Sequence, residues 1–377
     1  MPMVATIVVG AGVVGLSAAW ELHRRGVRVT VVDPAPGRGA SRAAAGMLAP
    51  AAELVWGEES LAPVFLDSAG RYPAFVAAVE AASGLRVGYR REGTLVLGAE
   101  RADARELASL AAHQRAAGYR AEPLAPSAAR ALEPALSPRV AGAVSLPDDH
   151  QVDPRGLVAA LLAALERGGA RLVRERVGRL ADDGWPEPGV VLEGGRVLRA
   201  DHVLLATAAA AVPGAPELPV RPVHGDVLRV RVLPGAPHLL TRVVRGLVAG
   251  RAVYLVPRLD GSVVIGATTR EDRVDAPRTE GVMRLLEDAR RLVPGVVETT
   301  IDEVLARARP GTHDGTPLVR ALAPGLGAVT GFSRHGVLLA PWAARAAADL
   351  VLGPAGDGAP DTTENMTENV TAGKDRA

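Results

Sequence analysis

Residues 6–33 read TIVVGAGVVGLSAAWELHRRGVRVTVVD, and this stretch decides the fold. Thr6–Val9 is a short apolar run of the kind found in buried strands. Val13–Arg25 has a helical pattern, and Gly26 follows it in a position where glycine commonly ends a helix. Val27–Val32 is again apolar and β-branched, so it predicts a second strand. A strand, a helix and a strand within about thirty residues indicate a βαβ unit whose two strands are parallel.

Glycines mark the turn between the first strand and the helix. Gly10 permits a tight turn, Gly12 lets the backbone approach a pyrophosphate, and Gly15 permits close packing of the helix on the strand. The start of the helix offers free N–H groups and a partial positive charge to phosphates. Asp33 ends the second strand, where a carboxylate can bind ribose hydroxyls. The nucleotide-binding residues predicted here are Gly10, Gly12, Val13, Val14, Gly15, Asp33 and Pro34.

This fingerprint alone does not separate FAD from a nicotinamide cofactor. Glycine-rich turns also occur between packed elements that bind nothing, although the strand, helix and acid at the right spacing disfavour that interpretation. No second fingerprint follows a strand, because the glycines at 325 and 327 precede one. Either the substrate itself supplies the hydride to a flavin, or the protein is an NAD-dependent dehydrogenase.

Composition excludes several function classes. The 377 residues suffice for two domains, and a net charge of +1 gives no reason to expect a nucleic acid or membrane partner. The chain has no cysteine, which excludes disulfides, iron–sulfur clusters and a covalent flavin–cysteine link, and we expect no metal ion. No secretory signal or membrane-length apolar run is present, so we expect a cytoplasmic protein. Lys374 is the only lysine, so a lone arginine is a weak signal.

The rest of the chain indicates a mixed α/β (α+β) fold. Helical patterns cover 63–82, 102–117, 157–167 and 337–352, and residues 170–206 read as a second βαβ-like return. Residues 219–267 alternate in the manner of an antiparallel sheet. We therefore predict a Rossmann-like nucleotide-binding domain from residues 1–80, 141–218 and 300–352, a substrate domain from 81–140 and 219–299, and a disordered tail over 353–377.

The segment after the βαβ unit carries a family resemblance. Residues 39–50 read GASRAAAGMLAP and resemble the flavin-contacting loop of the D-amino-acid oxidase family, in the form found in its glycine-oxidase branch. Small residues let backbone N–H groups press against a flavin ring, whereas the competing interpretation is an Ala-rich linker. Further segments resemble the same family in order along the chain: 132–136, 146–149, 152–155, 219–225, 254–261, 264–268, 309–315 and 331–341.

The resemblance implies a flavoenzyme with a site for an amino acid. Arg309 would clamp the substrate carboxylate, because the planar guanidinium suits bidentate binding. Arg334 would be a second basic residue near the flavin and the substrate, and the Tyr254 hydroxyl would add a bond to the carboxylate. We name no catalytic acid or base. Beyond the turn above, the residues implied to bind non-covalent FAD are Ser41, Arg42, Ala45, Gly46, Met47, Leu48, Val177, Arg334, His335, Gly336, Val337 and Leu338.

The implied reaction is oxidative deamination of glycine, and of sarcosine or small D-amino acids, with dioxygen reduced to hydrogen peroxide. The imine would pass to a thiazole synthase of thiamine biosynthesis, and we expect a homo-oligomer. Departures from the family pattern at 305–308 and at Thr269 leave substrate size open. The alternatives are another D-amino-acid or secondary-amine oxidase or dehydrogenase of this fold, an NAD-dependent dehydrogenase, and a non-catalytic nucleotide-binding protein.

Overall fold

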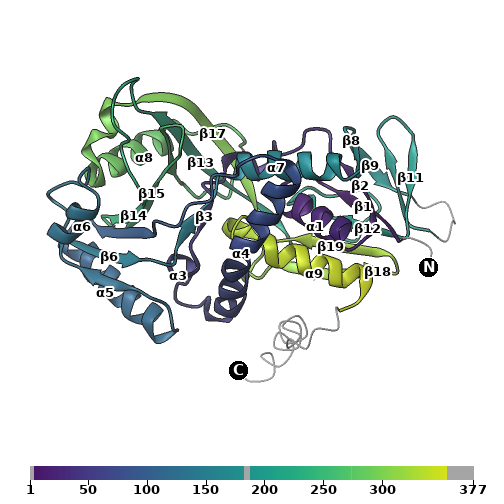
Figure 1. The fold of residues 1–377 in the computed structure, drawn as a ribbon, viewed down its shortest axis with the longest axis horizontal. Helices are drawn as coiled ribbons and strands as arrows, with labels where there is room; N and C mark the ends of the chain where they lie inside the picture. The colour runs from purple at the N-terminus through teal and green to yellow at the C-terminus, as the bar shows by residue number, and fades with distance from the viewer. Residues whose placement is uncertain (1–3, 182–186, 273, 355–377) are drawn as a thin grey trace.

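The computed structural model describes residues 4–181, 187–272 and 274–354, and its strands form two large sheets with long helices between and around them (Figure 1). Within these residues no helix has both the length and the apolar composition that crossing a bilayer requires. The predicted tail lies outside the described residues, apart from Gly353 and Pro354.

A six-stranded sheet contains the predicted βαβ unit. Its order is β18, β19, β12, β1, β2, β8, and all neighbours are parallel except β18, which is antiparallel to β19. The strands are β1 Ala5–Val9, β2 Arg28–Val32, β8 Arg171–Val173, β12 His202–Leu205, β18 Leu318–Ala323 and β19 Leu326–Thr330. The order shows that residues before 33 and after 317 are needed for the same sheet.

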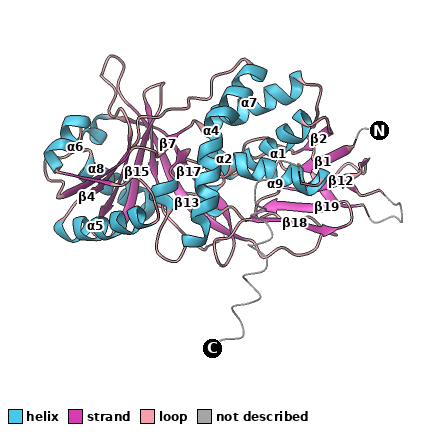
Figure 2. Ribbon diagram, turned by 60° about the horizontal axis from the view of Figure 1, so that its bottom comes forward, coloured by secondary structure: helices cyan, strands magenta, loops and turns pink. Residues whose placement is uncertain are grey.

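Both faces of this sheet are covered, which explains why β1 is apolar throughout. Val8 packs in a core shared with four helices, which Figure 2 shows gathered beside these strands. Ile7 and Val9 pack on the other side against a small antiparallel sheet. The helices are α1 Val13–Arg24, α4 Ala62–Ser83, α7 Pro154–Arg167 and α9 Ala340–Leu352, and the small sheet contains β9 Val177–Leu180, β10 Gly189–Leu192 and β11 Val197–Arg199.

An eight-stranded sheet forms the other half of the molecule. Its order is β17, β13, β16, β15, β14, β4, β6, β5, with β14 and β4 the parallel pair among antiparallel neighbours. The strands are β4 Thr94–Gly98, β5 Glu122–Leu124, β6 Gly142–Leu146, β13 Arg221–Arg231, β14 Val243–Val248, β15 Arg251–Pro257, β16 Ser262–Gly266 and β17 Thr300–Gly311. Helices α5 Arg101–Ala116, α6 Pro126–Leu132 and α8 Thr279–Leu292 pack in this half.

The two faces of the eight-stranded sheet have different neighbours. Leu255 and Ile265 pack in a core with Leu285 of α8. On the opposite face, Val256 and Val264 pack against Ala45, which belongs to the predicted flavin loop. That loop is built from α2 Ala40–Ala43, β3 Met47–Leu48 and α3 Pro50–Glu53, with β3 paired to β7 His150–Gln151. The loop therefore lies against one face of the large sheet.

The predicted mixed α/β fold with parallel and antiparallel sheets is confirmed, and so are β1, α1 and β2. The interpretation of residues 170–206 as a βαβ-like return is wrong, because its described part contains β8 to β12 and no helix. Helix α8 was not predicted. The closing helix begins at Ala340, and a short 3-10 turn, η3 Ser333–His335, precedes it.

The domain boundaries stay a prediction. Two strands that the proposed boundaries assign to the nucleotide-binding segments, β6 and β17, pair in the eight-stranded sheet. All strands of the six-stranded and three-stranded sheets fall within the predicted nucleotide-binding segments.

Candidate active site

The turn between β1 and α1 has the geometry of a phosphate cradle. Gly10 has a φ of +107°, and a Cβ there would lie 2.8 Å from the carbonyl carbon of Ala206. A Cβ on Gly15 would lie 3.0 Å from the Cβ of Ala206. At Gly12, leaving aside its two neighbours in the chain, the one atom of the described residues within 4 Å of an added Cβ is Ser41 Oγ, at 3.4 Å. Protein packing therefore does not fill the space above Gly12, and a dinucleotide pyrophosphate fits there at the start of α1.

Asp33 and Ser41 hold this turn in place. The Asp33 carboxylate accepts hydrogen bonds of 2.7 Å from the N–H groups of Ala11 and Ala35. Ser41 Oγ accepts a 2.9 Å bond from Val13 N at the start of α1. Each carboxylate oxygen has two acceptor positions, so Asp33 retains capacity for a ribose hydroxyl. The structure thus brings Asp33 and Ser41 to the glycine turn, and these residues fit FAD.

Packing and hydrogen bonds with residues from the middle of the chain hold the flavin loop in place. Gly46 has a φ of +75°, and a Cβ there would lie 2.7 Å from Pro154 Cδ. The buried Arg258 guanidinium donates to Ala45 O and, at 3.1 Å, to Val152 O. The segments 152–155 and 254–258 therefore lie against the flavin loop although they are distant from it in the sequence.

A buried carboxylate caps α3, the short helix that ends the loop. Asp149 is fully buried and accepts bonds of 3.0 and 2.9 Å from the N–H groups of Ala51 and Ala52. Burial raises the pKa of Asp149 to about 7, although the two backbone bonds oppose the shift. Asp149 therefore positions α3 and its last residue, Glu53, and changes charge near neutral pH.

Arg42 makes an ion pair with β17. Its Nη2 lies 2.5 Å from Glu303 Oε1, and Arg155 Nη2 lies 2.5 Å from Glu303 Oε2. Burial opposes ionisation of Glu303, but its bonds and ion pairs with Arg155 and Arg42 lower the pKa. The predicted cofactor residue Arg42 thus fixes α2 against the large sheet.

Two predicted substrate residues lie over glycines on the face of the large sheet. A Cβ on Gly225 would lie 2.5 Å from Arg309 Nη2, and a Cβ on Gly266 would lie 2.5 Å from Tyr254 Cζ. Burial raises the Tyr254 pKa, although attraction between the phenolate and Arg309 opposes the shift. Tyr254 therefore keeps its proton and can donate a hydrogen bond, while Arg309 lies within electrostatic range of it.

Arg309 and Arg334 differ in how they are satisfied. Among the described residues, the hydrogen bond found for the Arg309 guanidinium goes to Thr268 O at 3.3 Å, and no carboxylate pairs with it. Arg334 instead forms ion pairs with Glu53 at 2.7 Å and with Glu58 at 2.5 Å. Arg309 is accordingly the guanidinium with capacity for an incoming carboxylate.

Glu53 pairs with three basic side chains, and the sequence analysis did not predict it. Its oxygens lie 2.7 Å from Arg245 Nη1, 2.7 Å from Arg334 Nε and 3.3 Å from His335 Nε2. Burial opposes ionisation, but Arg245, His335 and Arg334 hold its pKa well below the usual value. Arg245 pairs across the sheet with Tyr254. The position of Glu53 at the end of the flavin loop is the only sequence signal, and Arg245 carried none.

The predicted segment 335–338 is fixed by α4. Ser68 Oγ donates to Leu338 O at 2.7 Å, and the Tyr72 hydroxyl donates to Val337 O. A Cβ on Gly336 would lie 3.8 Å from Val14 Cγ2, so this segment and the glycine turn meet. Val177 is on β9 in the small sheet and packs in the core under β1. The assignment of Val177 to the cofactor stays a prediction.

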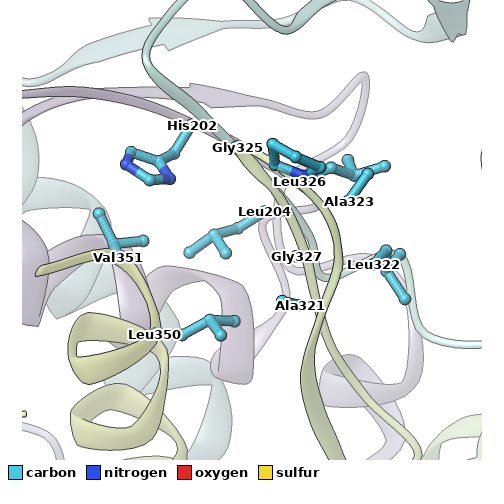
Figure 3. Close-up of a pocket in the computed structure, with 11 residues that line it drawn as sticks. His202, Leu204, Ala321, Leu322, Ala323, Gly325, Leu326, Gly327, Leu350 and Val351 are labelled. Atoms are coloured by element: carbon cyan, nitrogen blue, oxygen red, sulfur yellow. The ribbon is translucent and has the colours of Figure 1, made fainter. Parts of the chain in front are cut away.

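A cavity at the amino ends of strands β12 and β19 does not belong to this site. It has a volume of about 370 Å³ and is lined by residues that include His202, Leu326 and Leu350 (Figure 3). His202 and Leu326 begin parallel strands, whereas ligands of open α/β sheets bind at the carboxyl ends. The glycine turn follows the carboxyl end of β1, so the turn and this cavity lie at opposite ends of the parallel strands.

Comparison with known proteins decides the family. A sequence model described as DAO, FAD dependent oxidoreductase, matches residues 5–350. The chain belongs to this family. FAD is accordingly its cofactor, and the assignment of the glycine turn, Asp33 and the flavin loop to the FAD site stays a prediction.

Two relatives and one solved structure show how far the likeness extends. The bifunctional protein ThiO/ThiG of Trichormus variabilis is 33% identical over 357 residues, which cover 92% of this chain and 52% of that protein. This chain thus spans about half the length of that relative. Glycine oxidase of Geobacillus kaustophilus is 32% identical, with 91% of this chain and 92% of that protein covered. The crystal structure of glycine oxidase from Geobacillus kaustophilus has a TM-score of 0.84 at 31% identity, covering 94% of this chain and 96% of that one.

Proposed function

We propose that this oxidoreductase oxidises glycine, with sarcosine and small D-amino acids as further substrates, and that it supplies the imine to a thiazole synthase. The observation that carries the proposal is the Arg309 guanidinium, which has no carboxylate partner among the described residues and lies near Tyr254 on the sheet face that meets the flavin loop. A carboxylate-bearing substrate is what this pair fits. The names of relatives, glycine oxidase and ThiO/ThiG, support the substrate and the pathway.

The residues would act mainly by positioning. Arg309 would bind the two carboxylate oxygens and Tyr254 would donate a third bond, which fixes the α-carbon of the substrate. When bound, FAD would supply the acceptor for the hydride of that carbon and the means of passing its electrons to dioxygen, which gives hydrogen peroxide. The substrate nitrogen would be bound as the neutral amine, so loss of the hydride gives the protonated imine directly and no catalytic base is required. Water then hydrolyses the imine to glyoxylate and ammonia unless it is handed on.

An anaerobic absorbance spectrum tests this proposal. The FAD-loaded protein is mixed with glycine, sarcosine, proline and D-alanine in separate runs, and bleaching of the flavin band is followed. Bleaching by glycine, with peroxide released when air is admitted, is the expected result. Bleaching only by proline or a larger D-amino acid would replace glycine by that substrate and favour the alternative of another amine oxidase. Bleaching without peroxide would indicate a dehydrogenase, and no bleaching by any of them would overturn the proposal.

A further inference from the structure

A second cavity lies behind the flavin loop and is separate from the residues assigned above to FAD and substrate. Its volume is about 260 Å³, slightly below the roughly 300–1,000 Å³ of sites for drug-sized ligands. The residues that matter in its wall are Gln151, Asp153, Arg229, Arg258, Asp260 and Ser262. We call it the Arg229–Arg258 cavity.

Both named arginines are buried and incompletely bonded. Arg258 is 7% exposed and Arg229 is 8% exposed. Two nitrogens of Arg258 donate to protein oxygens, but its Nε has no hydrogen-bond partner among the described residues, and neither has Arg229 Nη2. Burial lowers the pKa of Arg258 to about 10 and also lowers that of Arg229. Burying guanidinium N–H groups without acceptors destabilises the folded state. A ligand that accepts hydrogen bonds from these two donors would remove that cost.

The carboxylates nearby have other partners. Glu303 Oε2 lies 3.9 Å from Arg229 Nε, but the same carboxylate is held at 2.5 Å by Arg42 and Arg155. Asp260 accepts from Ser262 N at 3.0 Å and from Ser262 Oγ at 2.7 Å.

Two of the four arginines in the wall are already paired. Arg86 lies 2.6 Å from Glu80 and Arg90 lies 3.0 Å from Glu92, and Asp153 accepts from Arg155 N at the start of α7. Among the described residues, the carboxylate found within 4 Å of the Arg229 and Arg258 guanidinium groups is Glu303, at 3.9 Å from Arg229. These two arginines are therefore the ones in the wall without a close carboxylate.

We propose that the Arg229–Arg258 cavity binds a small oxyanion, a phosphate or carboxylate group, between the two guanidinium groups. Arginine is suited to both because its fork of N–H donors matches two adjacent oxygens. A bound oxyanion would accept from Arg258 Nε and Arg229 Nη2. It would also stabilise the flavin loop, because the other nitrogens of Arg258 hold Ala45 O and Val152 O on either side of Gly46.

Calorimetric titration of the FAD-saturated protein tests the binding. Inorganic phosphate and succinate are the two probes, with chloride at equal ionic strength as the reference. Bound FAD occupies the pyrophosphate cradle, so phosphate cannot bind there. We expect one site per chain for at least one probe, and the responding probe distinguishes a phosphate from a carboxylate ligand. Absence of a chloride-corrected signal for both probes up to about 50 mM would overturn the proposal, because two charge-assisted bonds correspond to affinity in the millimolar range or tighter.

Two variants locate the site. Arg229→Gln should weaken binding of the responding probe about tenfold or more, as expected for loss of a charged hydrogen bond. Arg320→Gln removes the same charge from an exposed position on β18 in the other sheet and should leave binding unchanged. Equal binding by wild type and Arg229→Gln would overturn the assignment. If Arg229→Gln does not fold, Arg229→Lys gives the same comparison with the charge kept and the fork removed. Glycine-dependent bleaching is measured separately, so failure here does not bear on the proposed reaction.

Discussion

Replacing Arg309 with methionine removes the proposed carboxylate clamp while keeping a side chain of similar length. In the structure, the guanidinium has Thr268 O as its hydrogen-bond partner, at 3.3 Å, so little of its bonding to the protein is lost. A bidentate carboxylate makes two charge-assisted bonds of roughly 1.5–3 kcal/mol each. Arg309 is partly exposed, and allowing for solvent screening reduces the total to about 2–4 kcal/mol. That corresponds to a rise of roughly 30- to 700-fold in KM for glycine.

The assay is steady-state oxygen consumption with glycine, accompanied by the absorbance spectrum of bound flavin. We expect the spectrum of Arg309→Met to match wild type, because the Arg309 side chain contacts none of the residues of the glycine turn. Arg307→Met is the control, since Arg307 lies two residues away on β17 and donates to Arg38 O at 3.2 Å. A KM within threefold of wild type for Arg309→Met, with flavin retained, would refute the clamp.

Three further outcomes are expected. Gly225→Ala should raise KM for glycine about tenfold or more with little change in melting temperature, because the new Cβ displaces the far end of Arg309; an unchanged KM contradicts this. Asp33→Asn should increase flavin loss on dialysis, because the variant loses one of two acceptors that hold Ala11 and Ala35; full retention counts against the role. Asp149 binds its proton more tightly when folded, so its contribution to stability should fall as pH rises from about 4 to 7 and level off above. Melts of wild type and Asp149→Asn should show this slope only in wild type.

The nucleotide half was predictable because its signals are local. Glycine spacing, an apolar strand and a terminal acid all lie within 6–33, and each is required by the backbone geometry of the turn. Residues 170–206 were misjudged because short strands of an antiparallel sheet and a crossover give similar apolar runs. Helix α8 did carry a signal, with apolar residues at 282, 285, 286, 289 and 292.

The charged part of the site was not predictable in the same way. Arg245 faces Tyr254 because β14 and β15 pair in one particular register, and one residue of slippage would reverse the face. Motif position identified Arg334, but it could not show that Glu53 and Glu58 already neutralise it. Among forty-odd cationic residues, three-dimensional pairing decides which of them keep a free donor.

The strand order of the six-stranded sheet has a consequence for synthesis on the ribosome. The glycine turn leaves the ribosome first, but α1 packs on α9, which is made about three hundred residues later. Strand β12 likewise pairs with the later β19. At translation rates of about 5–20 residues per second, this leaves the apolar face of α1 without its cover for roughly fifteen seconds to a minute. We therefore expect the nascent chain to expose this face during that interval and to complete the six-stranded sheet only after β19 has been released.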